Sequence, residues 1–206
     1  MSMLIQETIR QTVFQAGKHD NDSAKELDKP VVYLMRGLPA CGKSHTARQL
    51  AGDVGVILET DEYFISEVGD PDDYSWDDEL LDDAREWNFG RFQDAIAQSR
   101  TPIVVDRGNG LNLDTKEYAQ YAVDNGYRVE LREPDSPWWN EIRVLLKYRP
   151  ATNELLDEWA AELERISQDI HRVGYKTIRR WMQHWADDLH IDEILNYRIR
   201  DNDQDY

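Results

Sequence analysis

The sequence predicts an α/β domain built on a parallel β-sheet, with helices on both faces of the sheet and a helical lid after it. Two observations support this fold class. Short apolar runs alternate along the chain with segments of helical periodicity, which is typical of β-α-β units. The first apolar run also leads directly into the glycine-rich stretch "RGLPACGKSH" and then into a helical segment. A chain of 206 residues is long enough for one domain with a buried core.

The expected elements begin with an appended N-terminal helix. "MLIQETIRQTVFQ" has apolar residues at helical spacing and precedes the polar linker "AGKHDNDSAKELDKP", so we expect residues 1–30 to stand apart from the main domain. "VVYLM" over 31–35 is an apolar run rich in β-branched residues, which favours a buried parallel strand. A helix over 43–51 and a second strand over 54–59 follow.

Two further apolar runs, at 102–106 and 127–133, complete the predicted sheet. Helices are predicted before and between them, over 79–99 and 113–124. Gly126 is well placed to cap the second of these helices.

The rest of the chain is predicted to be helical. Beyond Pro137 helical periodicity continues almost to Leu195, and the last residues, 196–206, form an acidic tail. We therefore expect one domain over 31–195, whose lid and insertion cover about 138–172.

The composition indicates an acidic protein of a reducing compartment. The formal net charge is −17, and such a surface repels phosphate polymers unless a basic patch is set apart. Cys41 is the single cysteine, which excludes an internal disulfide. No apolar run reaches membrane-spanning length, and the first residues carry acid too early for a signal peptide. We expect a cytoplasmic protein with no membrane partner.

The strongest motif is the loop after the first strand. It matches in full the phosphate-loop pattern of P-loop NTPases. Glycines let successive backbone N–H groups turn inward around a phosphate, and the helix N-terminus adds its dipole. Lys43 would reach the β- and γ-phosphates of a nucleotide, and Ser44 would ligate Mg²⁺. An ordinary strand-to-helix turn is the alternative, but the placement between strand and helix favours a nucleotide site. The expected nucleotide-binding residues are Gly37, Leu38, Pro39, Ala40, Cys41, Gly42, Lys43, Ser44 and His45.

Cys41 has two interpretations inside this loop. The preferred one is a small side chain that fills a slot where serine would also serve. The other is an oxidisable thiol, because a lysine and a helix N-terminus can lower a thiol pKa. The sequence supplies no second cysteine to resolve such an oxidation.

Two aspartates follow predicted strands at the edge where the loop lies. Ligands of open parallel sheets bind at the carboxyl ends of the strands. Asp61, in "ETDEYF", is expected there as the base that accepts a proton from an attacking hydroxyl, or as a holder of Mg²⁺ through water. Asp106 ends the Walker-B-like run "PIVVD" and is expected to hold Mg²⁺. Arg107 and Asn109, on the loop after it, are positioned to touch a substrate.

These motifs occur in an order that resembles a known family. The ordered set spans about residues 31–190 apart from one insertion, and comprises "YLMRGLPACGKSHTARQL", "TDEYF", "AREWNFGRFQDAI", "PIVVDRGN", "YRVELREPDSPW" and "HRVGYKTIRRWMQHW". The chain resembles the polynucleotide-kinase-like branch of P-loop kinases, especially the kinase-like domain of the NEDD-ligase-binding-protein-like family. It is similar, more distantly, to bacteriophage polynucleotide kinase and to the N-terminal domain of cyclic-nucleotide phosphodiesterase.

This resemblance implies an ATP-dependent phosphotransferase that uses Mg²⁺ beneath a helical lid. It places the hydroxyl-activating carboxylate at Asp61 and the phosphate contacts at the loop. Asn88 and Arg91 also match family positions. They are expected to orient the loop after Asp106 or to contact the substrate, with a purely structural hydrogen bond as the alternative.

The lid is expected to supply cations over the transferring phosphoryl group. The resemblance points to Lys147, Arg149 and Arg172, the two arginines being the expected catalytic pair. Alternatively, these charges decorate solvated helix faces and pair with acids one turn away. Residues 150–169 are an insertion, which implies either an enlarged lid or an extra helix beside it.

The sequence leaves the phosphoryl acceptor open. "DRGN" over 106–109 stands where relatives often have Asp-Asn-Thr-Asn, and Phe64 stands where the bacteriophage enzyme has an arginine that contacts nucleic acid. Residues 59–86 are strongly acidic and would repel a polyanion. The resemblance implies a nucleic acid with a 5′-hydroxyl, and the acidic segment restricts this expectation to a short single strand. A small metabolite or a nucleoside is the rival acceptor, and a nucleotide-binding interaction module without transfer is the rival function.

Overall fold

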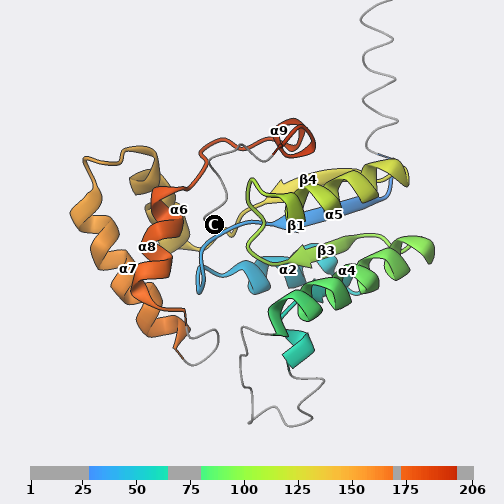
Figure 1. Cartoon of the computed structure of the whole chain (residues 1–206), viewed down its shortest axis with the longest axis horizontal. Coiled ribbons are helices and arrows are strands. Elements are labelled where there is room, and N and C mark those ends of the chain that lie inside the picture. The colour runs from blue at the N-terminus through green and yellow to red at the C-terminus, as the bar shows by residue number, and fades with distance from the viewer. Residues whose placement is uncertain (1–27, 65–79, 169–172, 199–206) are drawn as a thin grey trace, which may run out of the picture.

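The fold is centred on a four-stranded sheet whose strands are all parallel (Figure 1). This computed structural model describes residues 28–64, 80–168 and 173–198. The strands are β1 (Val31–Met35), β2 (Val56–Glu59), β3 (Ile103–Asp106) and β4 (Arg128–Arg132), in the spatial order β2-β3-β1-β4. The predicted α/β fold with a parallel sheet is confirmed.

The central strands are buried because helices cover both sides of the sheet. Every residue of β3 is buried, whereas the edge strand β4 keeps its side chains partly exposed. The chain moves from β1 to β2 in one direction across the sheet, and then from β2 through β3 to β4 in the other. Since such crossovers are right-handed, the first helix must lie on the face opposite to the next two.

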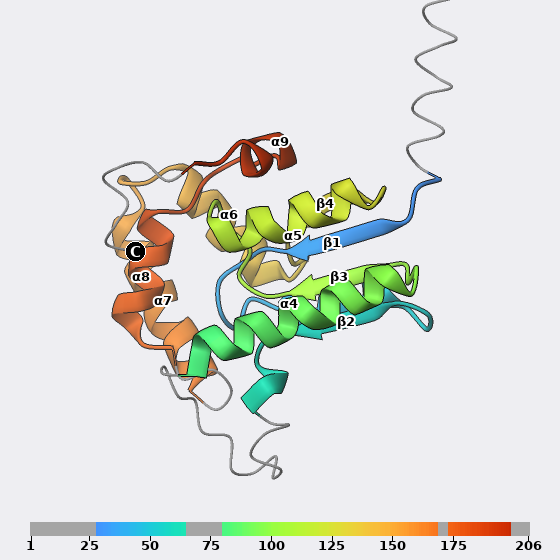
Figure 2. The same ribbon diagram turned by 45° about the vertical axis from the view of Figure 1, so that its right-hand side comes forward.

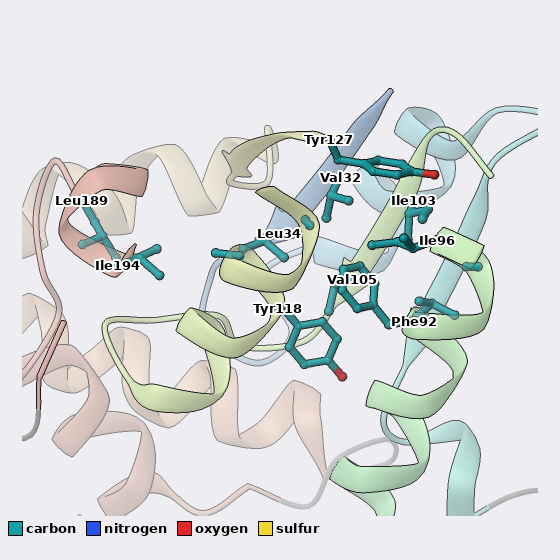
Figure 3. Packing of buried hydrophobic residues seen from close by; sticks show 14 residues of the cluster. Val32, Leu34, Phe92, Ile96, Ile103, Val105, Tyr118, Tyr127, Leu189 and Ile194 are labelled. Atoms are coloured by element: carbon teal, nitrogen blue, oxygen red, sulfur yellow. The ribbon is translucent and has the colours of Figure 1, made fainter. Parts of the chain in front are cut away.

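One face is covered by α2 (Lys43–Ala51), whose Ala47 and Ala51 pack on Met35 and Val104. The other is covered by α4 (Leu81–Ala97), α5 (Leu113–Asp124) and the short α9 (Ile191–Leu195). Figure 3 shows this larger core, in which Phe92 and Tyr118 meet between α4, α5 and the strands.

A separate helical layer lies beyond the carboxyl ends of the strands, toward which the arrowheads point in both views (Figures 1 and 2). It consists of α6 (Pro137–Lys147), α7 (Asn153–Ser167) and α8 (Tyr175–Gln183). The side chain of Ser136 caps α6 by accepting a hydrogen bond from the backbone N–H of Trp139, and proline occupies the first helical position. The insertion forms α7, which packs as an extra helix against α8 and α6.

This helical layer has its own core, and the glycine-rich loop is part of it. Leu38 and Cys41 are buried together with Trp139, Ile178 and other apolar side chains of the three helices. The lid is therefore packed directly against the loop that it is expected to cover.

Several predicted boundaries differ from the observed ones, and some lie outside the described residues. The last three strands are shorter than their apolar runs, whereas β1 has its predicted bounds. Within the described residues, the helical region after Pro137 is broken at 148–152 and 184–190. The predicted N-terminal helix, most of the acidic loop after β2 and most of the tail lie outside the described residues. Within the described ranges, no helix is long and apolar enough to cross a membrane.

Candidate functional site

The glycine-rich loop joins β1 to α2 in a conformation that requires its glycines. Gly37 and Gly42 have φ of 153° and 96°, and Ala40 also lies in the left-handed region at 56°. A Cβ on Gly37 would come within 2.7 Å of the sulfur of Cys41. Gly42 is the N-cap of α2 and offers no capping side chain, and the first turn carries no acid. The first N–H groups of α2 therefore face an environment that suits an anion.

Lys43 and Cys41 both donate to one carbonyl of the loop. Nζ of Lys43 lies 2.8 Å from the carbonyl oxygen of Leu38, so its ammonium group is held within the loop. Sγ of Cys41 lies 2.7 Å from the same oxygen. Burial raises the pKa of the Cys41 thiol, more than the nearby Lys43 lowers it. The side chain fills a slot as a protonated thiol, and the geometry does not favour the oxidisable interpretation. His45 is exposed and contacts Gln49 on α2.

The start of α6 holds the loop from the opposite side. Oγ of Ser136 donates to the carbonyl of Cys41 over 2.8 Å, and Nε1 of Trp138 donates to the carbonyl of Ala40 over 3.2 Å. These two bonds attach the start of α6 to the backbone of the loop.

Two strand-end carboxylates lie at the same edge of the sheet. Leu34 pairs with Val105, so Asp106 lies beside the end of β1, just before the loop begins. Asp106 is also paired in register with Glu59 of β2 and is mostly buried. Asp61 follows two residues beyond Glu59. The structure thus brings Asp61, Asp106 and the loop to one edge, as the sequence predicts.

Glu59 is a site residue that the sequence reasoning missed. Burial and then the neighbouring carboxylates of Asp106, Glu62 and Asp61 raise the pKa of Glu59 to about 7. We therefore expect Glu59 to bind protons more tightly than an ordinary glutamate, at the edge where Mg²⁺ and phosphate are expected. The sequence does show an acidic residue at the end of an apolar run. It does not show that β2 pairs with β3 in the register that places Glu59 beside Asp106.

The two predicted residues after Asp106 differ in what they contact. Asn109 is almost fully buried, and its Nδ2 donates to the carbonyls of Met35 and Val105 over 2.8 and 3.1 Å. It fastens the loop to β1 and β3 and does not reach outward. Arg107 instead donates to Asp114 over 2.8 Å, with its guanidinium group 5.6 Å from the ring centre of Tyr118.

The predicted residues of α4 contact neighbouring elements. Asn88 is buried and donates to the hydroxyl of Tyr118 over 3.2 Å, and burial raises the pKa of that hydroxyl. Arg91 pairs with Glu62 at 2.6 Å and stacks 4.4 Å from the ring centre of Trp87. These two residues connect α4 to α5 and to the segment after β2, respectively.

Two of the predicted lid cations, Lys147 and Arg149, lie within the described residues, and both contact other parts of the chain. Arg149 donates to the carbonyls of Leu146 and Trp185, both at 2.6 Å, and lies 3.7 Å from Asp187. Lys147 is exposed and its Nζ lies 3.9 Å from Asp188. Arg172 lies outside the described residues. In this structure Arg149 links the end of α6 to the segment after α8.

Arg36, next to the loop, is a second residue that the sequence reasoning missed. It is 4% exposed, pairs with Glu133 at 3.1 Å, and stacks 3.7 Å from the ring centre of Trp185. It also donates to the carbonyl of Ala186. Burial lowers its pKa, against the opposing effects of Glu133 and Asp187. Arg36 thus ties the end of β1 to the segment that follows the lid.

The strand–loop–helix unit and the strand-end carboxylates define a nucleotide-binding, P-loop kinase-like domain. A family profile described as AAA domain matches residues 32–185, and the chain belongs to this family. It is 35% identical over 171 residues to human (Homo sapiens) NEDD4-binding protein 2, covering 82% of this chain and 8% of that protein. It is 26% identical over 153 residues to human YLP motif-containing protein 1, covering 63% of this chain and 7% of that protein. The chain therefore spans less than a tenth of the length of either relative.

Two solved structures are similar to parts of this chain at low sequence identity. One is a chain of the Pnkp1/Rnl/Hen1 RNA repair complex, at 17% identity and a TM-score of 0.42, covering 81% of this chain and 44% of that one. Another is shikimate kinase from Acinetobacter baumannii in complex with shikimate, at 18% identity and a TM-score of 0.32, covering 84% and 90%.

Proposed function

We propose that this domain transfers the γ-phosphoryl group of ATP to a hydroxyl group, with Mg²⁺. One observation carries the proposal: an anion-binding loop at the end of β1 lies at the same sheet edge as Asp106 and Asp61. That edge combines N–H donors for phosphate, hard oxygen ligands for a cation and a carboxylate able to take a proton. These are the parts that phosphoryl transfer needs.

The loop fits a nucleotide by the chemistry of its donors. The N-terminal N–H groups of α2 and the ammonium group of Lys43 would hold the β- and γ-phosphates, with Lys43 exchanging the Leu38 carbonyl for a phosphate oxygen. The oxygens of Ser44 and Asp106 are of the kind that Mg²⁺ prefers, and these two residues would hold the ion. Bound there, Mg²⁺ would neutralise charge on the phosphates.

Asp61 is the proposed base. In the reaction the acceptor oxygen forms a bond to the γ-phosphorus while the bond from that phosphorus to the β,γ-bridging oxygen breaks, which releases ADP. The proton of the acceptor hydroxyl passes to the Asp61 carboxylate and from there to solvent. General-base catalysis of this kind typically contributes about 10²–10⁴-fold to the rate.

A nucleotide-binding interaction module without transfer is the rival function. The observation in its favour is that Arg149 is hydrogen-bonded to backbone carbonyls and does not reach the loop. Retention of both strand-end aspartates supports the kinase instead. A short 5′-hydroxyl nucleic acid and a small metabolite or nucleoside are the two proposed kinds of acceptor, in a cytoplasmic setting where ATP and Mg²⁺ are available.

Transfer from ATP labelled in its γ-phosphate, tested on 5′-hydroxyl oligonucleotides and on nucleosides, separates these possibilities. Lys43→Ala should abolish measurable ATP binding in calorimetry, because the ammonium group lies inside the loop. Asp61→Asn should keep ATP affinity and lose about 10²–10⁴-fold in transfer rate. Asp94→Asn, an exposed acid on α4, is the matched control and should behave as the parent. Transfer at the parental rate by Asp61→Asn removes the proposed base. A parent that binds ATP but phosphorylates none of these acceptors supports the rival module.

A further inference from the structure

A pocket of about 660 Å³ opens between α4 and α5, outside the glycine-rich loop. Its volume lies in the range of small-molecule sites. Arg107 lines the pocket and directly follows Asp106, so the pocket begins one residue from the carboxyl end of β3. No role assigned above to the loop or to the strand-end carboxylates makes use of this space.

Two half-buried aromatic rings contribute to the lining of the pocket. Phe89 of α4 meets Tyr118 of α5 edge to face, with ring centres 5.0 Å apart, and Tyr118 itself is 1% exposed and belongs to the core. Figure 3 shows the ring of Tyr118 extending from α5 toward α4. The half-buried rings of Phe89 and Trp87 are therefore the ones that face the space. Such surfaces bind flat or puckered rings by stacking and apolar contact.

The charges of the pocket disfavour an anion. Its described lining carries four carboxylates against two guanidinium groups, from Asp82, Glu86, Asp114 and Glu117 against Arg85 and Arg107. Both arginines are already engaged, since Arg107 donates to Asp114 and Arg85 donates to Asp82 over 3.2 Å while also lying 3.6 Å from Asp114. A phosphate group would have to displace these pairs and would then face the remaining acids. Carboxylates instead accept hydrogen bonds from the hydroxyl groups of an uncharged ligand.

Gly90, which lines the pocket, is a second observation in favour of a ligand site. It lies in the middle of the 17-residue helix α4, where glycine is a poor helix former. No described atom lies within 4 Å of the position that a Cβ would take, and its φ is not in the left-handed region. Packing and backbone conformation therefore do not require glycine here. A side chain at this position of the pocket wall would occupy the pocket.

The pocket is connected to the segment that carries Asp61. The ring of Trp87 lies 5.6 Å from that of Tyr63, two residues after Asp61. Arg91, stacked on Trp87, pairs with Glu62, the neighbour of Asp61. A ligand against Trp87 is thus adjacent to the segment from which the proposed base comes.

From this arrangement we propose that the α4–α5 pocket is the acceptor subsite and that it takes an uncharged, ring-bearing, hydroxylated molecule of the nucleoside type. The inference rests on the proposed function for its catalytic meaning. The aromatic side chains would stack on the ring of the ligand, and the carboxylates would accept hydrogen bonds from its hydroxyl groups. The net negative charge of the lining would exclude phosphorylated chains. A 5′-hydroxyl oligonucleotide is then the poorer acceptor, because its phosphates would approach four acids.

The test measures binding before chemistry. Uridine, uridine 5′-monophosphate and a 5′-hydroxyl oligothymidylate are titrated by ligand-observed NMR into the full chain, with a non-hydrolysable ATP analogue and Mg²⁺ present so that the loop is occupied. Uridine should bind, and its monophosphate and the oligonucleotide should bind at least about tenfold more weakly, a difference of about 1.4 kcal/mol. Tighter binding of either phosphorylated probe than of uridine overturns the proposal.

Gly90→Leu is the blocking variant, and Ala97→Leu, which adds the same side chain at an exposed position of α4, is its control. Gly90→Leu should weaken uridine binding at least about tenfold without lowering the melting temperature or the affinity for the ATP analogue. Gln93→Phe, at a second position that lines the pocket, repeats the block if Gly90→Leu does not fold. Uridine binding that survives both blocks sinks the pocket assignment.

Failure of the inference and failure of the proposed function give different results. In one case the parent binds the ATP analogue, Lys43→Ala does not bind it, and uridine does not bind the parent loaded with the analogue. The acceptor subsite is then wrong and the nucleotide assignment stands. If uridine binds in a manner sensitive to Gly90→Leu but the analogue does not bind, the pocket stands as a nucleoside site and the kinase proposal falls.

Discussion

We predict that Glu59 makes the stability of this domain fall as the pH rises, the direction opposite to that of an acid whose pKa is lowered by folding. Its pKa is raised from 4.5 to about 7 by burial and by neighbouring carboxylates, most of all Asp106. Between these pH values the folded state holds a proton that the unfolded state has released. Stability is therefore highest below about pH 4.5 with respect to this group, and falls as the pH rises through about 7.

The size of the effect follows from the same pKa. At about 1.4 kcal/mol for each tenfold change in proton affinity, the full difference corresponds to about 3 kcal/mol. Because Glu59 is partly exposed, water screens its neighbours and we expect about 1–2 kcal/mol. Glu59→Gln, which cannot ionise, should be more stable than the parent by this amount at pH 8 and nearly equal to it at pH 5.

Urea unfolding followed by tryptophan fluorescence, at pH 5 and pH 8 with EDTA to remove metal ions, measures the difference directly. Glu158→Gln, an exposed acid on α7, is the control and should shift stability by less than about 0.5 kcal/mol at both pH values. The reasoning is refuted if Glu59→Gln differs from the parent by the same amount at pH 5 and pH 8, because the effect would then not come from a proton.

Three further predictions concern the lid and the loop that packs against it. Trp139→Ala should cost about 3–5 kcal/mol in urea unfolding, because Trp139 is fully buried against Trp185; Trp181→Ala, at a side chain 41% exposed, should cost far less. Cys41 should react with Ellman's reagent more than about tenfold more slowly in the native protein than in urea, and equal rates would contradict its burial. Arg149→Met should lower stability by about 1.5–3 kcal/mol through its two lost hydrogen bonds and leave ATP affinity unchanged. Unchanged stability with lost transfer would make Arg149 catalytic instead.

The elements that could be predicted from sequence are those fixed by local signals. The strand at 31–35 and the helix at 43–51 are observed at the predicted residues. The glycine-rich loop between them marks both the end of the strand and the start of the helix. The helix at 113–124 also has its predicted limits. Asn112 accepts a hydrogen bond from the backbone N–H of Thr115 at its start, and Gly126, with φ of 83°, follows its end.

The lid could not be divided correctly because its breaks depend on packing. Its helical periodicity runs past Lys147 and Gln183, where the helices end. The turn after Lys147 lets α7 fold back on α6, and the three lid helices bury a shared core, which no local propensity encodes. The position of Glu59 in the site could not be predicted for the same reason. The register that places Glu59 beside Asp106 is a property of the assembled sheet.

The roles of the arginines were the hardest to predict, and the helix ends explain why. The last turn of α6 leaves carbonyl oxygens without partners inside the helix, and the segment after α8 is irregular. Arg149 satisfies the carbonyls of Leu146 and Trp185, and Arg36 satisfies that of Ala186. A guanidinium group recruited by the backbone in this way holds the lid to the sheet, and its charge is not directed at the transferring phosphoryl group. Among the described residues of the expected catalytic set, Lys43 is the cation held inside the loop, so we expect Lys43 and Mg²⁺ to contribute charge stabilisation there in the proposed reaction.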